Sequence, residues 1–124
     1  MTESEMRLIL KNTNGNFQSE DVPQLYCEIQ TLRGRVEREK GKQISFEDAL
    51  YKWVDAVYNP IMNEVINNRA LKNAKGSLSS TELYFIIYEK AEQLSTFAGI
   101  KYCIEEYIKE NSGPLDRLLY LFAA

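Results

Sequence analysis

Apolar residues recur at helical spacing along most of this chain, and this periodicity limits the possible folds more than any other feature. Steps of three and four residues place side chains on one face of an α-helix. One stretch with these steps holds Leu25, Ile29, Leu32 and Val36. The next holds Phe46, Ala49, Leu50, Trp53, Val57, Pro60 and Ile61, and a third holds Leu83, Ile87, Ala91, Leu94 and Ala98. The pattern predicts amphipathic helices that bury these faces.

Start and stop signals divide the pattern into separate helices. Ser19 or Asp21 can cap a first helix, with Pro23 in its first turn, where the missing N–H costs no hydrogen bond. Ser45 and Ser79 are each followed three residues later by an acidic residue, which is typical of a capping box. We expect Gly41 and Gly99 to end the helices that precede them.

Pro60 lies inside the second apolar stripe, which stays in phase up to it and slightly beyond. A proline inside a helix removes one backbone hydrogen bond and crowds the carbonyl four residues earlier, here that of Ala56. The sequence therefore predicts either one kinked helix or two helices that meet at Pro60.

These signals predict an all-α fold, a five- to six-helix bundle built from two helical hairpins with a proline kink in the central helix. A shift of 58 residues aligns segment 25–50 with segment 83–108, and we interpret this match as an internal repeat of one hairpin. We expect residues 1–20 to form an N-terminal arm that could be mobile, and 21–124 to form a single helical domain. Within it, Leu115–Phe122 reads as a short last helix that docks on the bundle or extends an interface.

Composition narrows the classes of function. The chain has 124 residues and no histidine, so the commonest general base and metal ligand is absent. It carries 15 basic and 18 acidic residues, a net charge of −3, whereas non-specific nucleic-acid binders are usually basic. No phosphate-binding glycine loop or nucleophile motif is present. We therefore expect a protein that is not an enzyme and for which direct nucleic-acid binding is disfavoured.

We predict no cofactor and no metal site. Cys27 and Cys103 lie far apart in the sequence and belong to no paired-cysteine motif, so we expect reduced thiols in the core. The adjacent acidic pairs Glu47–Asp48 and Glu105–Glu106 fall where first helical turns are expected, and there the helix dipole favours negative charge. Because adjacent helical residues diverge around the axis, these pairs are poor candidates for catalysis or metal binding.

The sequence also predicts the cellular location of the protein. The longest apolar runs are far shorter than the ~20 residues of a membrane span. The first ten residues lack the basic and long apolar regions of a signal peptide. We expect a cytoplasmic protein without membrane contact.

Two groups of residues are candidates for binding. The first is aromatic and comprises Trp53, Tyr58, Pro60 and Tyr84, which either meet a partner or pack the kink; the phase of Trp53 with the apolar stripe favours packing. The second is a weak basic patch of Arg33, Arg35, Arg38, Lys40 and Lys42. It could meet phosphates or an acidic partner, although a solvated face that complements the helix dipole is the more economical interpretation.

The stretch from Ile44 to Ile61, with Thr81-Glu82-Leu83-Tyr84 downstream, resembles a helical module of uncharacterised bacterial proteins. That module has a tryptophan, then Val-Tyr-x-Pro, a spacer, and Thr-Glu-x-x-Leu-Tyr or a close variant. It occurs at the C-terminus of proteins with a lipopolysaccharide-kinase-like domain, and similar stretches follow ParB-like domains. The resemblance covers residues 24–110, with matches at Trp53, Val57, Tyr58, Pro60, Glu82, Leu83, Tyr84 and Gly99.

The resemblance implies an accessory helical module and no activity. The usual Phe-Pro-Gly-Arg of the spacer is replaced here by the segment 73–78. From all these features we predict a non-enzymatic protein–protein interaction module that binds another protein or a second copy of itself. The alternative is a small acidic regulator or inhibitor that acts on nucleic-acid machinery.

Overall fold

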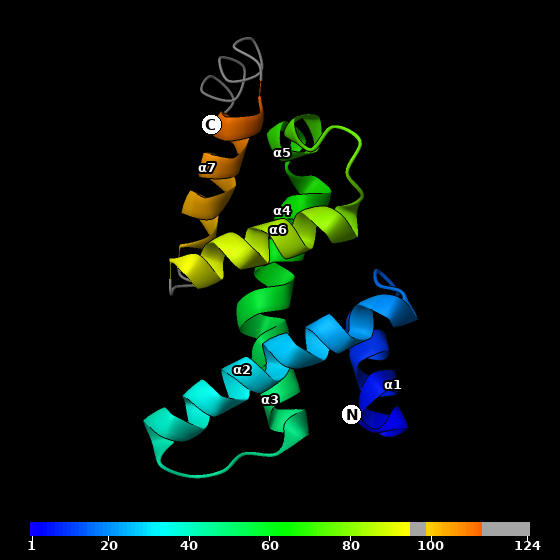
Figure 1. Cartoon of the computed structure of the whole chain (residues 1–124), viewed down its shortest axis with the longest axis vertical. Coiled ribbons are helices and arrows are strands. Elements are labelled where there is room, and N and C mark those ends of the chain that lie inside the picture. Colours follow the sequence, from blue (N-terminus) through cyan, green and yellow to red (C-terminus); the bar gives the residue numbers. More distant parts are fainter. Residues whose placement is uncertain (95–98, 113–124) are drawn as a thin grey trace. The chain divides into compact units, whose positions relative to one another are not determined.

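The computed structural model describes residues 1–94 and 99–112, and these residues contain helices without strands (Figure 1). The predicted all-α class is therefore confirmed. The predicted last helix over 115–122 and the apolar position Ala98 lie outside the described residues. The chain divides into two compact units, Met1–Tyr58 and Asn59–Ala124, which differ from the predicted segments 1–20 and 21–124.

The first unit contains α1 (Glu3–Asn12), η1 (Ser19–Asp21), α2 (Val22–Lys40), α3 (Phe46–Trp53) and η2 (Val54–Tyr58). The long helix α2 packs against both α1 and α3 (Figure 1). Leu25 and Ile29 on the predicted face of α2 are fully buried, whereas Leu32 and Val36 are half-buried.

The N-terminal segment is helical, where the sequence predicted an arm. The Thr2 hydroxyl accepts a hydrogen bond from the Glu5 amide at 3.1 Å, and the Glu5 carboxylate accepts one from the Thr2 amide at 2.8 Å. This reciprocal capping box starts α1. Ile9 is fully buried and Phe17 nearly so, so residues 1–20 contribute to the core of the first unit.

The connection from α2 to α3 follows the predicted signals. Gly41 ends α2 with φ of +68°, a left-handed conformation that glycine adopts without steric cost. Ser45 caps α3 by accepting a hydrogen bond from the Asp48 amide at 3.1 Å. Asp48 does not return a bond to the Ser45 amide, so this is a simple N-cap rather than the capping box that the sequence suggested.

The irregularity predicted at Pro60 occupies the preceding turn. Residues Val54–Tyr58 form η2, a π-helical turn between α3 and α4 (Asn59–Asn67). Pro60 is the second residue of α4 and has no N–H to offer the carbonyl four residues earlier. Wider π-helical turns are a known way for a helix to absorb such a break.

The second unit contains α4 (Asn59–Asn67), α5 (Arg69–Ala74), α6 (Ser80–Gln93) and α7 (Ile100–Asn111). Helix α6 packs against α4 and α7, and α5 packs against both α4 and α7. Ser79 starts α6 with the predicted capping box, in which Ser79 and Glu82 exchange two hydrogen bonds of 3.1 Å.

The end of α6 differs from the prediction. The helix ends at Gln93, and Leu94, expected on the buried face, is 49% exposed. Gly99 precedes α7 as its N-cap residue with φ of −93° and does not end α6 in a left-handed conformation.

Each unit holds one of the two hairpins of the proposed repeat, α2 with α3 and α6 with α7, and the repeat itself stays a prediction.

Candidate functional site

Trp53 and Tyr58 lie in the core of the first unit. Trp53 is fully buried and Tyr58 is 2% exposed. Their rings stack with centroids 5.5 Å apart, and Phe17 lies against Tyr58 at 5.9 Å. Because η2 carries Tyr58 and α3 carries Trp53, the stacked pair packs the irregular turn against the N-terminal segment. A role of these two residues in partner binding stays a prediction.

The Tyr58 hydroxyl joins η2 to the turn after α1. It donates a hydrogen bond to the Thr13 carbonyl at 2.8 Å and accepts one from the Asn16 side-chain amide at 2.7 Å. Burial raises the pKa of Tyr58, and the hydrogen bond from Asn16 partly opposes that rise. The hydroxyl is thus held neutral and satisfied, as a buried tyrosine requires.

Glu28 is the charged side chain buried within the described residues, at 4% exposure. Its Oε1 accepts a hydrogen bond from the Trp53 indole N–H at 3.2 Å. This contact fixes α2 against α3 through a specific polar pair.

Pro60 and Tyr84 belong to the second unit. Pro60 is half-buried in the first turn of α4, and Tyr84 is fully buried in α6. The Tyr84 ring meets its neighbour Phe85 edge to face, with centroids 5.3 Å apart. As with Trp53 and Tyr58, contact of these two residues with a partner stays a prediction.

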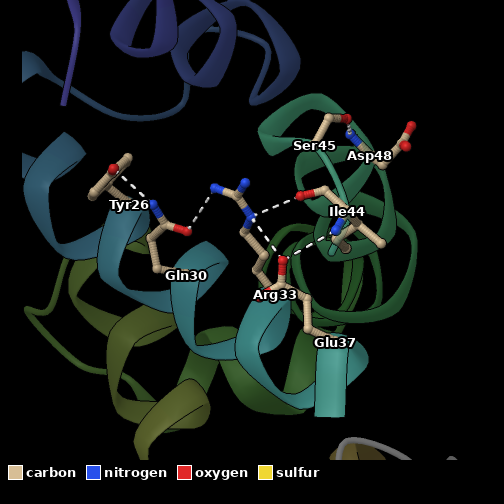
Figure 2. Close-up of polar contacts among 7 residues, drawn as sticks. All are labelled: Tyr26, Gln30, Arg33, Glu37, Ile44, Ser45 and Asp48. Atoms are coloured by element: carbon tan, nitrogen blue, oxygen red, sulfur yellow. Dashed lines mark hydrogen bonds and ion pairs between the residues drawn. The ribbon is translucent and has the colours of Figure 1, made fainter. Parts of the chain in front are cut away.

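The three arginines of the predicted basic patch lie on α2, and its role in binding stays a prediction. Figure 2 shows Arg33 reaching the backbone of the segment between α2 and α3: its Nε donates to the Ile44 carbonyl at 3.0 Å. The Ile44 amide donates to Glu37 Oε2, also at 3.0 Å, and Arg33 forms an ion pair with Glu37 at 3.7 Å. These bonds hold the segment around Ile44 against α2, so Arg33 stabilises the connection between α2 and α3.

The rest of this network continues along α2. The Arg33 guanidinium donates to Gln30 at 3.4 Å, and Gln30 donates to the Tyr26 hydroxyl at 2.7 Å (Figure 2). The Arg38 guanidinium folds over Gly34, with Nη1 3.5 Å from the place that a Cβ would occupy. Arg35 is half-buried. The basic patch therefore divides into arginines that lie along α2 and two lysines at its C-terminal end, Lys40 as its last residue and Lys42 just beyond it.

Three lysines from different segments line one open hollow in the first unit. Lys40 ends α2, Lys42 lies in the connection, and Lys52 lies in the last turn of α3. The hollow has a volume of about 390 Å³ and is completed by Ile44, Asp48, Tyr51 and Asp55. We call this set of residues the lysine hollow.

Electrostatic repulsion is concentrated in the lysine hollow. The nearby charge of Lys52 is the largest cause that lowers the pKa of Lys40, and the charge of Lys42 lowers this pKa further. The carboxylate of Asp48 opposes this shift. Tyr51 is 49% exposed beside these charges. Tyrosine is one of the residue types enriched among binding hot spots.

Sequence analysis identified Lys40 and Lys42 but missed Lys52 and Tyr51. Lys52 follows Lys40 by twelve residues, and only the return of the chain through Gly41 and Ser45 brings the two side chains together. Positions 51 and 52 directly precede the buried Trp53 and are both exposed. The helical periodicity therefore does predict that these two side chains face solvent.

The second unit has a smaller hollow of about 150 Å³ between α6 and α7, lined by Lys90, Gln93, Leu94, Tyr102, Cys103 and Glu106. Lys90 forms an ion pair with Glu110 at 3.1 Å. The pKa of Tyr102 is raised mainly by the charge of Glu106, and burial raises the pKa of the Cys103 thiol. A raised thiol pKa makes Cys103 a poor nucleophile.

Within the described ranges 1–94 and 99–112, no cluster of three or more cysteine or acidic residues could hold a metal ion. Cys27 is exposed, contrary to the expectation that both thiols lie in the core, and Cys103 is buried. Across the same part of the chain, every helix is too short or too polar to cross a membrane.

In comparisons with known proteins, no family model, curated protein or solved structure matches this chain. The resemblance of residues 24–110 to the accessory helical module of bacterial proteins therefore stays a prediction.

Proposed function

We propose that this protein is a non-enzymatic helical interaction module that binds an acidic segment of a partner protein in the lysine hollow. The main observation behind this proposal is that Lys40, Lys42 and Lys52 line one hollow together with the exposed Tyr51. An acidic segment complements these charges and relieves the repulsion between Lys40 and Lys52.

The surrounding contacts support binding at this place. Arg33 and Glu37 hold the backbone at Ile44, which forms part of the wall of the hollow. Lys52 and Tyr51 lie on a helix that the buried Trp53 anchors to α2 through Glu28. A surface carried by fixed elements loses less conformational entropy on binding than a flexible one.

The test is fluorescence anisotropy of a labelled glutamate-rich peptide titrated with the full chain. We expect binding that weakens as salt rises, because the contacts are ionic and exposed. The double substitution Lys40→Met and Lys52→Met should weaken binding by about tenfold or more. Lys11→Met is the matched control, since Lys11 is an exposed lysine of the same unit outside the hollow.

The same titration separates the alternatives. A peptide that fails to bind at low salt contradicts the proposal, as does equal binding by the double variant. Tighter binding of a single-stranded oligonucleotide than of the peptide would favour direct action on nucleic acid instead. Light scattering over a dilution series reports self-association, in which a second copy would supply the acidic segment.

A further inference from the structure

We propose that the lysine hollow selects a single phosphoryl group, carried by a phosphoserine or phosphothreonine of the partner segment. This inference rests on the proposed function and names the group that the hollow prefers. It starts from the chemistry of the hollow, where three lysines from different segments line one open space of about 390 Å³.

The number and type of the cations favour a doubly charged ligand. Lys40 and Lys52 repel each other closely enough for Lys52 to be the main cause that lowers the Lys40 pKa, and Lys42 adds to the effect. A carboxylate brings one negative charge to such a place. A phosphate monoester brings about −1.5 to −2 at neutral pH and three acceptor oxygens, which suits lysine ammonium groups that act as point charges.

The carboxylates of the hollow favour an isolated phosphoryl group over a chain of them. Asp48 and Asp55 line the same space as the lysines. A nucleic-acid strand would bring successive phosphates towards these carboxylates and would be repelled. A peptide with one phosphoryl group avoids this repulsion, and basic residues beside the phosphoserine can pair with Asp48 and Asp55.

Tyr51 extends the recognition to the residues that flank the phosphoryl group. Tyr51 is 49% exposed and lines the hollow together with the lysines and the two aspartates. The face of a tyrosine ring attracts the guanidinium of an arginine. The hollow thus offers cations for a phosphoryl group, and carboxylates and a ring for a basic neighbour.

The experiment compares three labelled peptides of one sequence, with arginines on both sides of a central serine, phosphoserine or glutamate. Fluorescence anisotropy with the full chain should give binding of the phosphoserine peptide at least about tenfold tighter than that of the glutamate peptide. Lys52→Met should remove this difference, whereas Lys11→Met should keep it. Circular dichroism of each variant checks that the helices remain folded.

A second readout follows the Lys40 side chain itself. Binding of the phosphoserine peptide should raise the pKa of Lys40, measured by NMR titration of its terminal CH₂ group, because a dianion offsets the repulsion from Lys52. An unchanged Lys40 pKa in the saturated complex would overturn the inference.

The outcomes distinguish this inference from the proposed function. Equal affinity for the phosphoserine and glutamate peptides overturns the phosphoryl selectivity and leaves the binding of acidic segments intact. If neither these peptides nor the glutamate-rich peptide binds, both proposals fail. A single-stranded oligonucleotide that binds tighter than the phosphoserine peptide overturns the choice of a protein segment.

Discussion

The indole N–H of Trp53 donates a hydrogen bond to the carboxylate of Glu28 at 3.2 Å, and both side chains are buried. The contact joins α2 to α3, the two helices whose C-terminal ends supply Lys40 and Lys52 to the hollow. The packing of the core and the position of the candidate binding surface therefore depend on the same pair of helices.

The first prediction concerns this pair. Trp53→Phe removes the donor to Glu28 and leaves a cavity where the larger ring was fully buried, so it should lower the free energy of unfolding by about 2–4 kcal/mol, from the lost hydrogen bond and the lost packing together. Urea denaturation followed by circular dichroism measures the change. Tyr51→Phe is the control, because Tyr51 is exposed on the same helix and should change stability by about 0.5 kcal/mol or less. Equal stability of the two variants would contradict the burial of Trp53 and its hydrogen bond to Glu28.

The second prediction concerns the Tyr58 hydroxyl. Tyr58→Phe leaves the Thr13 carbonyl without its donor and should cost about 1–3 kcal/mol. Burial raises the pKa of Tyr58, so its folded state favours the neutral hydroxyl. That stabilisation is complete below pH 10.0, the ordinary value, and is lost as the pH rises through the raised pKa. Alkaline denaturation of Tyr58→Phe should therefore be less steep than that of the unaltered chain.

The third prediction concerns the segment between α2 and α3. Glu37→Ala removes the acceptor of the Ile44 amide and an ion-pair partner of Arg33. Hydrogen–deuterium exchange of the Ile44 amide should become about tenfold faster, in keeping with the loss of ~1.4 kcal/mol of local protection. Glu39→Ala, at an exposed position of the same helix, should leave this exchange rate unchanged.

The fourth prediction concerns the start of α6. Ser79→Ala removes the N-cap acceptor and should lower stability by about 1 kcal/mol. Hydrogen bonds from Ser79 lower the pKa of Glu82 below its ordinary 4.5, so the stabilisation by the Glu82 carboxylate is present above pH 4.5 and is lost as the pH falls through the lowered pKa. Glu82→Gln should flatten this acid-induced loss, and an unchanged acid profile would count against the capping box.

The sequence predicted correctly those helix ends and buried positions that depend only on residues nearby in the chain. Gly41 adopts the left-handed conformation expected of it, Ser45 and Ser79 cap the expected helices, and Leu25 and Ile29 are buried. In each case the cause lies within about one helical turn: a missing Cβ, a hydroxyl near a free amide, or a repeated apolar step.

The N-terminal segment shows a local signal that sequence analysis passed over. Thr2 and Glu5 have the spacing of a capping box, and the structure shows both of its hydrogen bonds. The turn residues from Asn12 to Asn16 suggested an arm. In the structure this turn supplies Thr13 and Asn16 to Tyr58, a contact across more than forty residues that periodicity cannot reveal.

The candidate site was predictable only in part, for a similar reason. Lys40 and Lys42 stood out as neighbours in the sequence, but the arginines grouped with them lie along α2 and one of them anchors Ile44. Lys52 joins the lysines only after the chain has turned through Gly41 and Ser45. Which cations share a hollow depends on this packing of α2 against α3, not on their spacing alone.

NMR mapping on the ¹⁵N-labelled full chain tests directly whether the lysine hollow is the binding surface. With the glutamate-rich peptide at saturation, the largest amide shifts should fall at Lys40, Lys42, Tyr51 and Lys52, and Lys11 should not move. Shifts centred on Lys90 and Tyr102 in the second unit, or no shifts at any residue, would contradict the assignment of the lysine hollow as the surface by which this protein binds its partner.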